Sequence, residues 1–141
     1  MHQGVLAVAR IPPQPGFATL LETSPRPLLL AAVEGIASAE NLGAIVRGCA
    51  AFGVHFLVVG ETCGSPFQRR AVSGSMGTIF EQPVVHVDHL VETLNSLRAR
   101  GVRCRAARTR PGTEKRFPAE LRGGGGRVLG AGCACRAPDD A

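Results

Sequence analysis

The chain has 141 residues, of which 45% are hydrophobic, so it is long enough for one domain and too apolar to be disordered throughout. Its longest uninterrupted apolar run, residues 28–33, is far too short to cross a bilayer as a helix. The formal net charge of +5 agrees with a polyanionic partner, although a GC-rich genome that favours arginine would give the same excess.

The rarer residue types indicate the setting and the mode of recognition. The absence of Trp and Tyr weighs against recognition of nucleic acid by base stacking. Five Cys residues include no paired C-x-x-C units: Cys49 and Cys104 fit a core, and Cys133 and Cys135 form a lone C-x-C. Arg10 interrupts the short apolar run near the N-terminus, so we expect no secretory signal. These features predict a reduced, cytoplasmic protein.

The first segment of the chain, residues 1–27, is expected to be extended. Residues 5–9 form a short apolar run that predicts an edge strand. Residues 11–27 contain five of the ten prolines and predict a linker that crosses the surface.

An alternation of apolar runs and helical patterns follows. Residues 28–33, 55–59, 84–87 and 102–107 have the length and composition of strands, and the first run is continuously apolar, as in a parallel strand covered on both faces. Helical segments lie between successive runs. This order predicts an α/β fold, with a parallel sheet and helices on both of its faces.

The helix expected after the first strand carries the most informative pattern. Leu42, Ile45, Val46 and Cys49 recur at the spacing of a helix that packs on a sheet, and Asn41 precedes them as a candidate N-cap. Gly43 and Gly48 each cost a helix roughly 1 kcal/mol relative to Ala, which favours a close approach of another segment.

Two further helices have recognisable starts. Ser65 and Pro66 predict the N-cap and first residue of a short helix that carries Arg69 and Arg70. Asp88 is the expected cap of an amphipathic helix that ends at Gly101. Its inward residues are Leu90, Val91, Leu94 and Leu97.

Several separated motifs, in a fixed order between about residues 2 and 108, resemble the SpoU family of RNA 2′-O-methyltransferases, within the SPOUT superfamily. The first is Glu34, then Asn41-Leu-Gly-Ala-Ile-Val-Arg47, then Ala50-Ala-Phe-Gly-Val54. The others are His2-Gln-Gly4, Val72-Ser-Gly-Ser-Met-Gly77, Ile79-Phe80 and Pro83-Val84. The resemblance implies a SPOUT-type α/β knot and transfer of a methyl group from S-adenosylmethionine to a ribose of rRNA or tRNA. It also implies a homodimer.

The family resemblance implies that Asn41 and Arg47 are the catalytic residues. Arg47 suits the holding of a phosphate or a ribose hydroxyl, because a guanidinium is a rigid fork that stays charged; taken alone, it would read as a solvated surface arginine. Asn41 can be a simple helix cap, a site residue at the carboxyl edge of the sheet, or both. Glu34 is expected to brace the loop or to pair with Arg47.

A second group of candidates lies downstream. Arg69, Arg70 and Ser75 fall in a block of the resemblance and are candidates to hold RNA phosphates, with a solvated basic helix face as the equal alternative. His86 and His89 form an H-x-x-H pair, but no further ligands accompany it, so we expect no metal site.

The last segment, residues 123–141, departs from the family pattern. Residues 123–126 are all glycine, where the resemblance would place a strand, and Gly132 stands where the family has Glu. The family's third motif, which completes the knot, is missing. The spacing of Gly124, Gly126 and Gly130 does not fit a dinucleotide fingerprint.

We therefore expect a truncated or frameshifted product, with a partial methyltransferase domain at residues 28–122 and an incomplete knot. For the donor, the resemblance carries over only the loop at Ala107, together with Leu129 and Gly130. The alternative function is a non-catalytic RNA-binding remnant that lacks the donor pocket.

Overall fold

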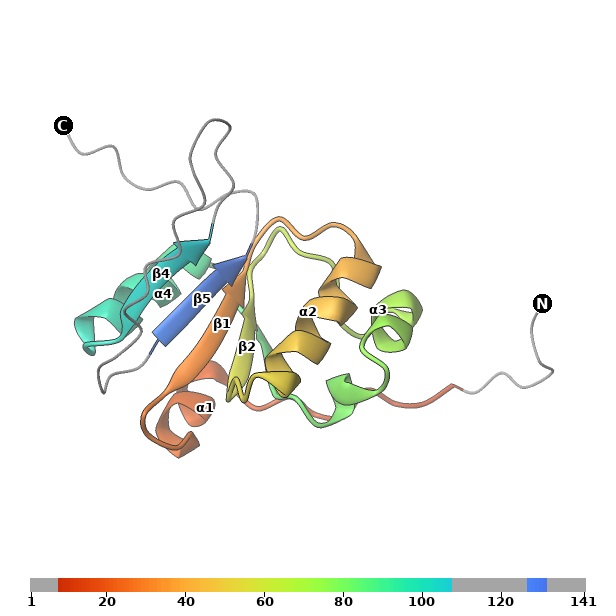
Figure 1. Cartoon of the computed structure of the whole chain (residues 1–141), viewed down its shortest axis with the longest axis horizontal. Coiled ribbons are helices and arrows are strands. Elements are labelled where there is room, and N and C mark those ends of the chain that lie inside the picture. The colour runs from red at the N-terminus through yellow and green to blue at the C-terminus, as the bar shows by residue number, and fades with distance from the viewer. Residues whose placement is uncertain (1–7, 108–126, 132–141) are drawn as a thin grey trace.

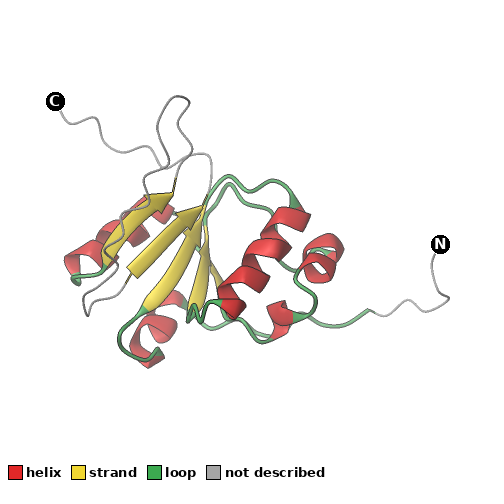
Figure 2. Cartoon of the chain, in the orientation of Figure 1, coloured by secondary structure: helices red, strands yellow, loops and turns green. Residues whose placement is uncertain are grey.

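The computed structural model describes residues 8–107 and 127–131. In these residues, five parallel strands form one sheet in the order β3-β2-β1-β5-β4, with helices packed beside it (Figures 1 and 2). The strands are β1 (Leu29–Val33), β2 (Phe56–Val59), β3 (Val84–His86), β4 (Arg103–Ala107) and β5 (Arg127–Ala131). The helices are α1 (Phe17–Thr23), α2 (Ala39–Ala51), α3 (Arg69–Gly74), the 3-10 helix η1 (Thr78–Phe80) and α4 (Leu90–Ala99). The predicted α/β fold with a parallel sheet is confirmed.

Alternate residues of the central strands supply the cores on the two faces of the sheet. Leu30 and Ala32 of β1 face a cluster that contains residues of α1 and α4. Ala31 and Val33 face the other cluster, with residues of α2. Because successive side chains of a strand point to opposite faces, a continuously apolar strand is buried on both sides. The helices therefore cover both faces, as expected.

The N-terminal segment differs from the extended linker that its prolines predict. Residues 17–23 contain no proline and form α1, in which Leu20 and Leu21 are buried. The ring of Phe17 lies edge-on to Phe56 of β2, with centroids 6.2 Å apart. Burial of these side chains stabilises a helix too short to persist alone. Of the expected strand at residues 5–9, residues 8 and 9 are not in a strand, and the rest lies outside the described residues.

Two of the expected helix caps are wrong. Helix α2 begins before Asn41, and its N-cap is Ser38, whose hydroxyl accepts a hydrogen bond from the Asn41 backbone N–H at 3.3 Å. For α4, the Leu90 N–H donates to the carboxylate of Glu61 at 3.2 Å, and no side-chain bond from Asp88 caps the helix. In each helix, a side-chain oxygen accepts from one of the free backbone N–H groups at its start.

The other boundaries shift by small amounts. Pro66 lies in a turn, and α3 starts only at Arg69. Leu97 and Leu90 of α4 are buried as expected, whereas Val91 is exposed. The strand starts move by one residue from three of the four expected runs, which is within the usual uncertainty of element ends.

The sheet includes part of the segment expected to be aberrant. Residues 127–131 form β5, which pairs in parallel with β1 on one side and β4 on the other. A strand therefore follows the glycine run, rather than being replaced by it. The expected domain boundary at residue 122 and the C-x-C of Cys133 and Cys135 lie outside the described residues.

The cysteines of the described residues form no disulfide. Cys49 is buried on the sheet face of α2, and burial raises the pKa of its thiol to about 11. Cys104 is partly buried against the core beside α4. Both act as small apolar residues, as predicted. In the same residues, no helix combines the length and the hydropathy that a transmembrane span needs.

Helices α2 and α3 touch at Gly43. A Cβ atom built on Gly43 would lie 2.3 Å from the carbonyl oxygen of Ala71 and 2.9 Å from the backbone nitrogen of Ser75, both in or next to α3. A Cβ on Gly48, in the same helix, meets no atom within 4 Å. The close-approach role expected for both glycines is therefore correct for Gly43 and wrong for Gly48.

This contact predicts opposite effects of two identical substitutions in α2. Gly43→Ala should destabilise the fold by about 1–3 kcal/mol, because α3 must move away from the new methyl group. Gly48→Ala should stabilise it by up to about 1 kcal/mol through helix propensity alone. Urea unfolding followed by circular dichroism measures both. Equal effects of the two substitutions would show that the helices do not touch at Gly43.

The cap of α4 predicts a pH dependence. Hydrogen bonds from its own backbone N–H and from that of Leu90 lower the pKa of the Glu61 carboxyl. A lowered folded pKa stabilises the protein above the unfolded pKa, about 4.3, and this stabilisation is lost as the pH falls through the folded value. Glu61→Ala should therefore lower Tm at pH 7, by an amount that shrinks toward pH 3. Glu22→Ala, which removes an exposed carboxylate of α1, is the control. A difference in Tm between Glu61→Ala and the unaltered chain that is the same at every pH would contradict the prediction.

Candidate functional site

The loops that follow β1 and β2 are tied together at the carboxyl edge of the sheet. The backbone N–H of Gly35 donates to the Thr62 hydroxyl at 2.9 Å, and that of Gly64 donates to the carbonyl oxygen of Ile36 at 3.1 Å. Gly35 has φ of 69°, in the left-handed region that glycine tolerates without strain. These bonds fix the path of the chain between Val33 and the start of α2.

Asn41 lies in the first turn of α2, directly after this loop. Its side chain is exposed and makes no hydrogen bond within the described part of the chain. The amide is therefore accessible from solvent at the carboxyl edge, where open α/β sheets place ligands. Glu34, at the end of β1, is partly buried and forms no ion pair with Arg47.

Arg47 lies further along α2 and contacts α3. Its guanidinium is exposed and donates a hydrogen bond from Nη1 to the carbonyl oxygen of Gly74 at 3.2 Å. Six residues of helix separate it from Asn41, which is about 9 Å along the axis and about 240° around it. No hydrogen bond joins Arg47 to Asn41 within the described residues, and the expectation that both side chains serve one opening stays a prediction.

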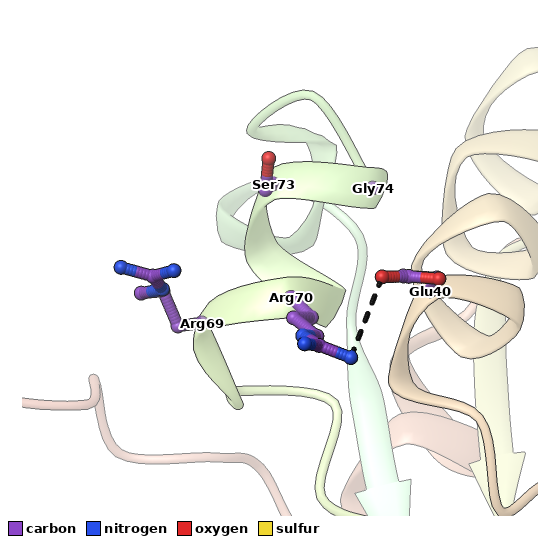
Figure 3. Close-up of a pocket in the computed structure, with 5 residues that line it drawn as sticks. All are labelled: Glu40, Arg69, Arg70, Ser73 and Gly74. Carbon is purple, nitrogen blue, oxygen red and sulfur yellow. Dashed lines mark ion pairs between the residues drawn. The ribbon is translucent and has the colours of Figure 1, made fainter. Parts of the chain in front are cut away.

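An open surface pocket of about 550 Å³ lies between α2 and α3 (Figure 3). Its lining residues are Glu40, Arg69, Arg70, Ser73 and Gly74. The Arg70 guanidinium is 3.8 Å from the Glu40 carboxylate, whereas the side chain of Arg69 extends away from α2. Both partners of this ion pair are largely exposed, so it contributes little to stability.

The pocket and Arg47 share Gly74, so the structure brings three predicted residues, Arg47, Arg69 and Arg70, to the α2–α3 side of the sheet. Glu40 was not predicted as part of this surface. The signal was present: Glu40, Gly43 and Arg47 are spaced at i, i+3 and i+7, which is one face of a helix. That face contacts α3.

Ser75 is not available for the phosphate contact predicted for it. Ser75 is fully buried, and its hydroxyl donates to the carbonyl oxygen of Val72 at 2.8 Å. This hydrogen bond stabilises the C-terminal end of α3. We therefore remove Ser75 from the candidate RNA-binding residues.

The residues predicted to hold the methyl donor lie in β4 and β5. In the sheet, these two strands lie on one side of β1, and β2 lies on the other. Ala107 is the last residue of β4 and is in register with Ala131, the last residue of β5. Gly130 pairs with Ala32 and Leu129 with Ala31, one and two residues before the strand end. The backbone of Ala107 is thus at the carboxyl edge, and that of Leu129 is nearer the middle of the strand.

His86 and His89, the H-x-x-H pair, lie at the end of β3 and just before α4. Across the described ranges, no three His, Cys, Asp or Glu side chains come together in a way that could hold a metal ion.

Comparison with known proteins adds evidence that is independent of this geometry. The model of the SpoU rRNA Methylase family matches residues 28–131. An uncharacterised tRNA/rRNA methyltransferase of Mycobacterium bovis is 35% identical over 103 residues, which cover 73% of this chain and 35% of the relative. The chain thus spans about a third of the length of the curated relatives it matches.

Solved structures show the same fold. An rRNA methyltransferase of Sinorhizobium meliloti bound to AdoMet superposes with a TM-score of 0.67 at 21% identity, over 84% of this chain and 45% of that one. The SpoU methyltransferase AviRb of Streptomyces viridochromogenes, in complex with AdoMet, superposes with a TM-score of 0.59 at 22% identity, over 77% and 42% of the two chains. The described sheet therefore has the fold of these methyltransferases. With its family model matched across residues 28–131, the chain belongs to the SpoU rRNA methylase family.

Proposed function

We propose that this chain acts in an S-adenosylmethionine-dependent RNA methyltransferase that methylates a ribose 2′-hydroxyl of rRNA or tRNA. The observation that carries the proposal is the Arg47 guanidinium, which is exposed and held by the Gly74 carbonyl beside a pocket with two more arginines. A preset cationic fork next to further cations suits a sugar-phosphate backbone. The names of the relatives, tRNA/rRNA methyltransferases, support the same substrate class.

Arg47 is proposed to orient and polarise the ribose hydroxyl. One of its five N–H donors is engaged by Gly74, and the others are free to bind the 2′-oxygen and an adjacent phosphate. Because the pKa of a guanidinium is above about 12, Arg47 is a poor general base. Arg47 would instead hold the hydroxyl so that its proton can pass to the neighbouring phosphate and then to water. Asn41 would position the nucleotide from the first turn of α2.

The donor, when bound, supplies an electrophilic methyl group. Small residues at the ends of β4 and β5, Ala107 and Gly130, fit the close approach of a ligand to backbone atoms, and we propose that they and Leu129 line its site. We also propose that the protein acts as a homodimer, as the family resemblance implies.

A second candidate function is RNA binding without methyl transfer. Gly132 stands where the family pattern has Glu, next to the proposed donor residues, whereas the cationic α2–α3 surface is independent of that position.

Calorimetry with S-adenosylmethionine and with rRNA or tRNA at two salt concentrations separates the two candidates. We expect saturable binding of the donor, together with RNA binding that weakens markedly between 50 and 200 mM salt, because phosphate contacts release counterions. RNA binding with no donor binding would favour the second candidate. The absence of both would overturn the proposal.

Substitution of Arg47 tests its role in the reaction. Arg47→Ala should lower methyl incorporation into RNA by about 100-fold or more, since it removes a group aimed at developing charge on the oxygen. Arg47→Lys keeps the charge but loses the fork, so little activity should return. Arg26→Ala, at another exposed arginine, is the matched control.

The position of the methyl group is read from alkaline hydrolysis, which cannot cleave after a 2′-O-methylated ribose. Label in alkali-stable dinucleotides is the expected result. Label on a base, or full activity of Arg47→Ala, would contradict the proposed chemistry.

A further inference from the structure

Met76, in the turn between α3 and η1, has a backbone conformation that is unusual for its residue type. Its φ is 53°, and across the described residues no other residue apart from glycines has a positive φ. In this left-handed region the Cβ atom of an L residue comes too close to the following carbonyl oxygen. Glycine adopts the same conformation without strain, as Gly77 does at φ 87°.

Hydrogen bonds on both sides of Met76 hold the turn in this conformation. The carbonyl oxygen of the buried Ser75 accepts from the Thr78 hydroxyl at 2.7 Å and from the Thr78 backbone N–H at 3.1 Å. The backbone N–H of Met76 itself donates to the carbonyl oxygen of Ser73 at 3.1 Å. Because its neighbours are fixed, Met76 cannot relax to a negative φ, and the strain persists.

The side chain of Met76 gains no packing that would offset this strain. It is 76% exposed and belongs to neither of the two hydrophobic clusters that fill the faces of the sheet. The fold therefore holds a large apolar side chain in solvent, at a position where glycine would be more comfortable. Strained residues and exposed apolar side chains both occur at binding sites.

Met76 borders the candidate site. Ser73 and Gly74, just before it, line the pocket between α2 and α3 (Figure 3). The Gly74 carbonyl oxygen accepts from the Arg47 guanidinium at 3.2 Å. Met76 follows Gly74 by two residues, so their Cα atoms are no more than about 7.6 Å apart. A nucleotide held by Arg47 would therefore have Met76 beside it.

A nucleobase suits the chemistry of this side chain. The thioether of methionine is flexible and polarisable, and it makes favourable contacts with aromatic rings. Apolar side chains, methionine among them, pack against bases in complexes with nucleic acids. A partner protein is a poorer fit, because the pocket next to Met76 is lined by charged and polar groups rather than by further apolar side chains.

We propose that Met76 packs against the face of a base in the RNA substrate, beside the ribose that Arg47 holds. This inference rests on the proposed function and adds a contact to a base, whereas the arginines contact the sugar-phosphate backbone. It gives a chain without Trp or Tyr a way to position a nucleotide through its base. The rigid turn around Met76 would present the side chain in a fixed place.

Met76→Gly in the full chain tests the proposal. Since glycine tolerates this φ, Tm should not fall. The dissociation constant for rRNA or tRNA should rise about 2- to 10-fold, the range for a contact between a thioether and a ring. The slope of log K against log salt should not change, because an apolar contact releases no counterions. Arg69→Gln, which removes a cation of the pocket, should instead lower that slope by about 0.7 to 0.9.

Three controls separate a contact with a base from other roles. Met76→Leu keeps an apolar side chain and should bind RNA within about 2-fold of the unaltered chain. Val91→Ala, which shortens an exposed apolar side chain of α4, should leave RNA binding unchanged. Inorganic polyphosphate, which has no bases, should bind the unaltered chain and Met76→Gly equally well.

The other outcomes would overturn the inference. If the unaltered chain binds RNA and Met76→Gly binds it equally well, Met76 contacts no base, and the proposed function is unaffected. If the unaltered chain binds no RNA, both proposals fail. A lower Tm of Met76→Gly would show that the side chain supports the fold, and weaker binding of polyphosphate would show a role at the backbone. A change in self-association alone, measured by analytical ultracentrifugation, would assign Met76 to a contact with a second copy of the chain.

Discussion

The contact between α2 and α3 at Gly43 sets the geometry of the candidate site. With no room for a Cβ atom, the backbone of α3 lies directly against α2. This short distance lets the Arg47 side chain reach the Gly74 carbonyl and places Arg70 opposite Glu40. A helix pair separated by ordinary side chains would leave these groups too far apart, since packed helix axes are usually 8–10 Å apart. One missing methyl group thus positions Arg47 and Arg70.

The carboxyl edge of the sheet is the second fixed element. The bond from Gly35 to Thr62 joins loops that are 27 residues apart in sequence, and it holds the start of α2 in place. The ends of β4 and β5 reach the same edge, because all five strands are parallel. In the proposed function, an acceptor nucleotide near α2 and a methyl donor near β4 would approach the same edge of the sheet, which brings the two reactants close together.

Sequence patterns predicted helices and strands better than they predicted which side chains form hydrogen bonds with each other. The continuously apolar strand at residues 28–33 and the stripe of α2 were correct, because burial on two faces or on one helical face leaves a periodic record. The predictions of the helix caps were wrong. Asn41 and Asp88 have the residue types of caps, but Ser38 and the distant Glu61 satisfy the donors instead. The RNA-binding role predicted for Ser75 was wrong because the exposure of this residue depends on how α3 packs, which a local sequence pattern does not indicate.

By itself, the sequence determined the family, the parallel α/β architecture, the small residue at Gly43 and the positions of Arg47, Arg69 and Arg70, because each of these depends on residue identity or on local periodicity. Only the tertiary structure decided which groups meet. It placed the Arg47 guanidinium on the Gly74 carbonyl, buried Ser75, and inserted β5 between β1 and β4. These outcomes depend on contacts between segments far apart in the chain, and such contacts are set by the packing of the whole core.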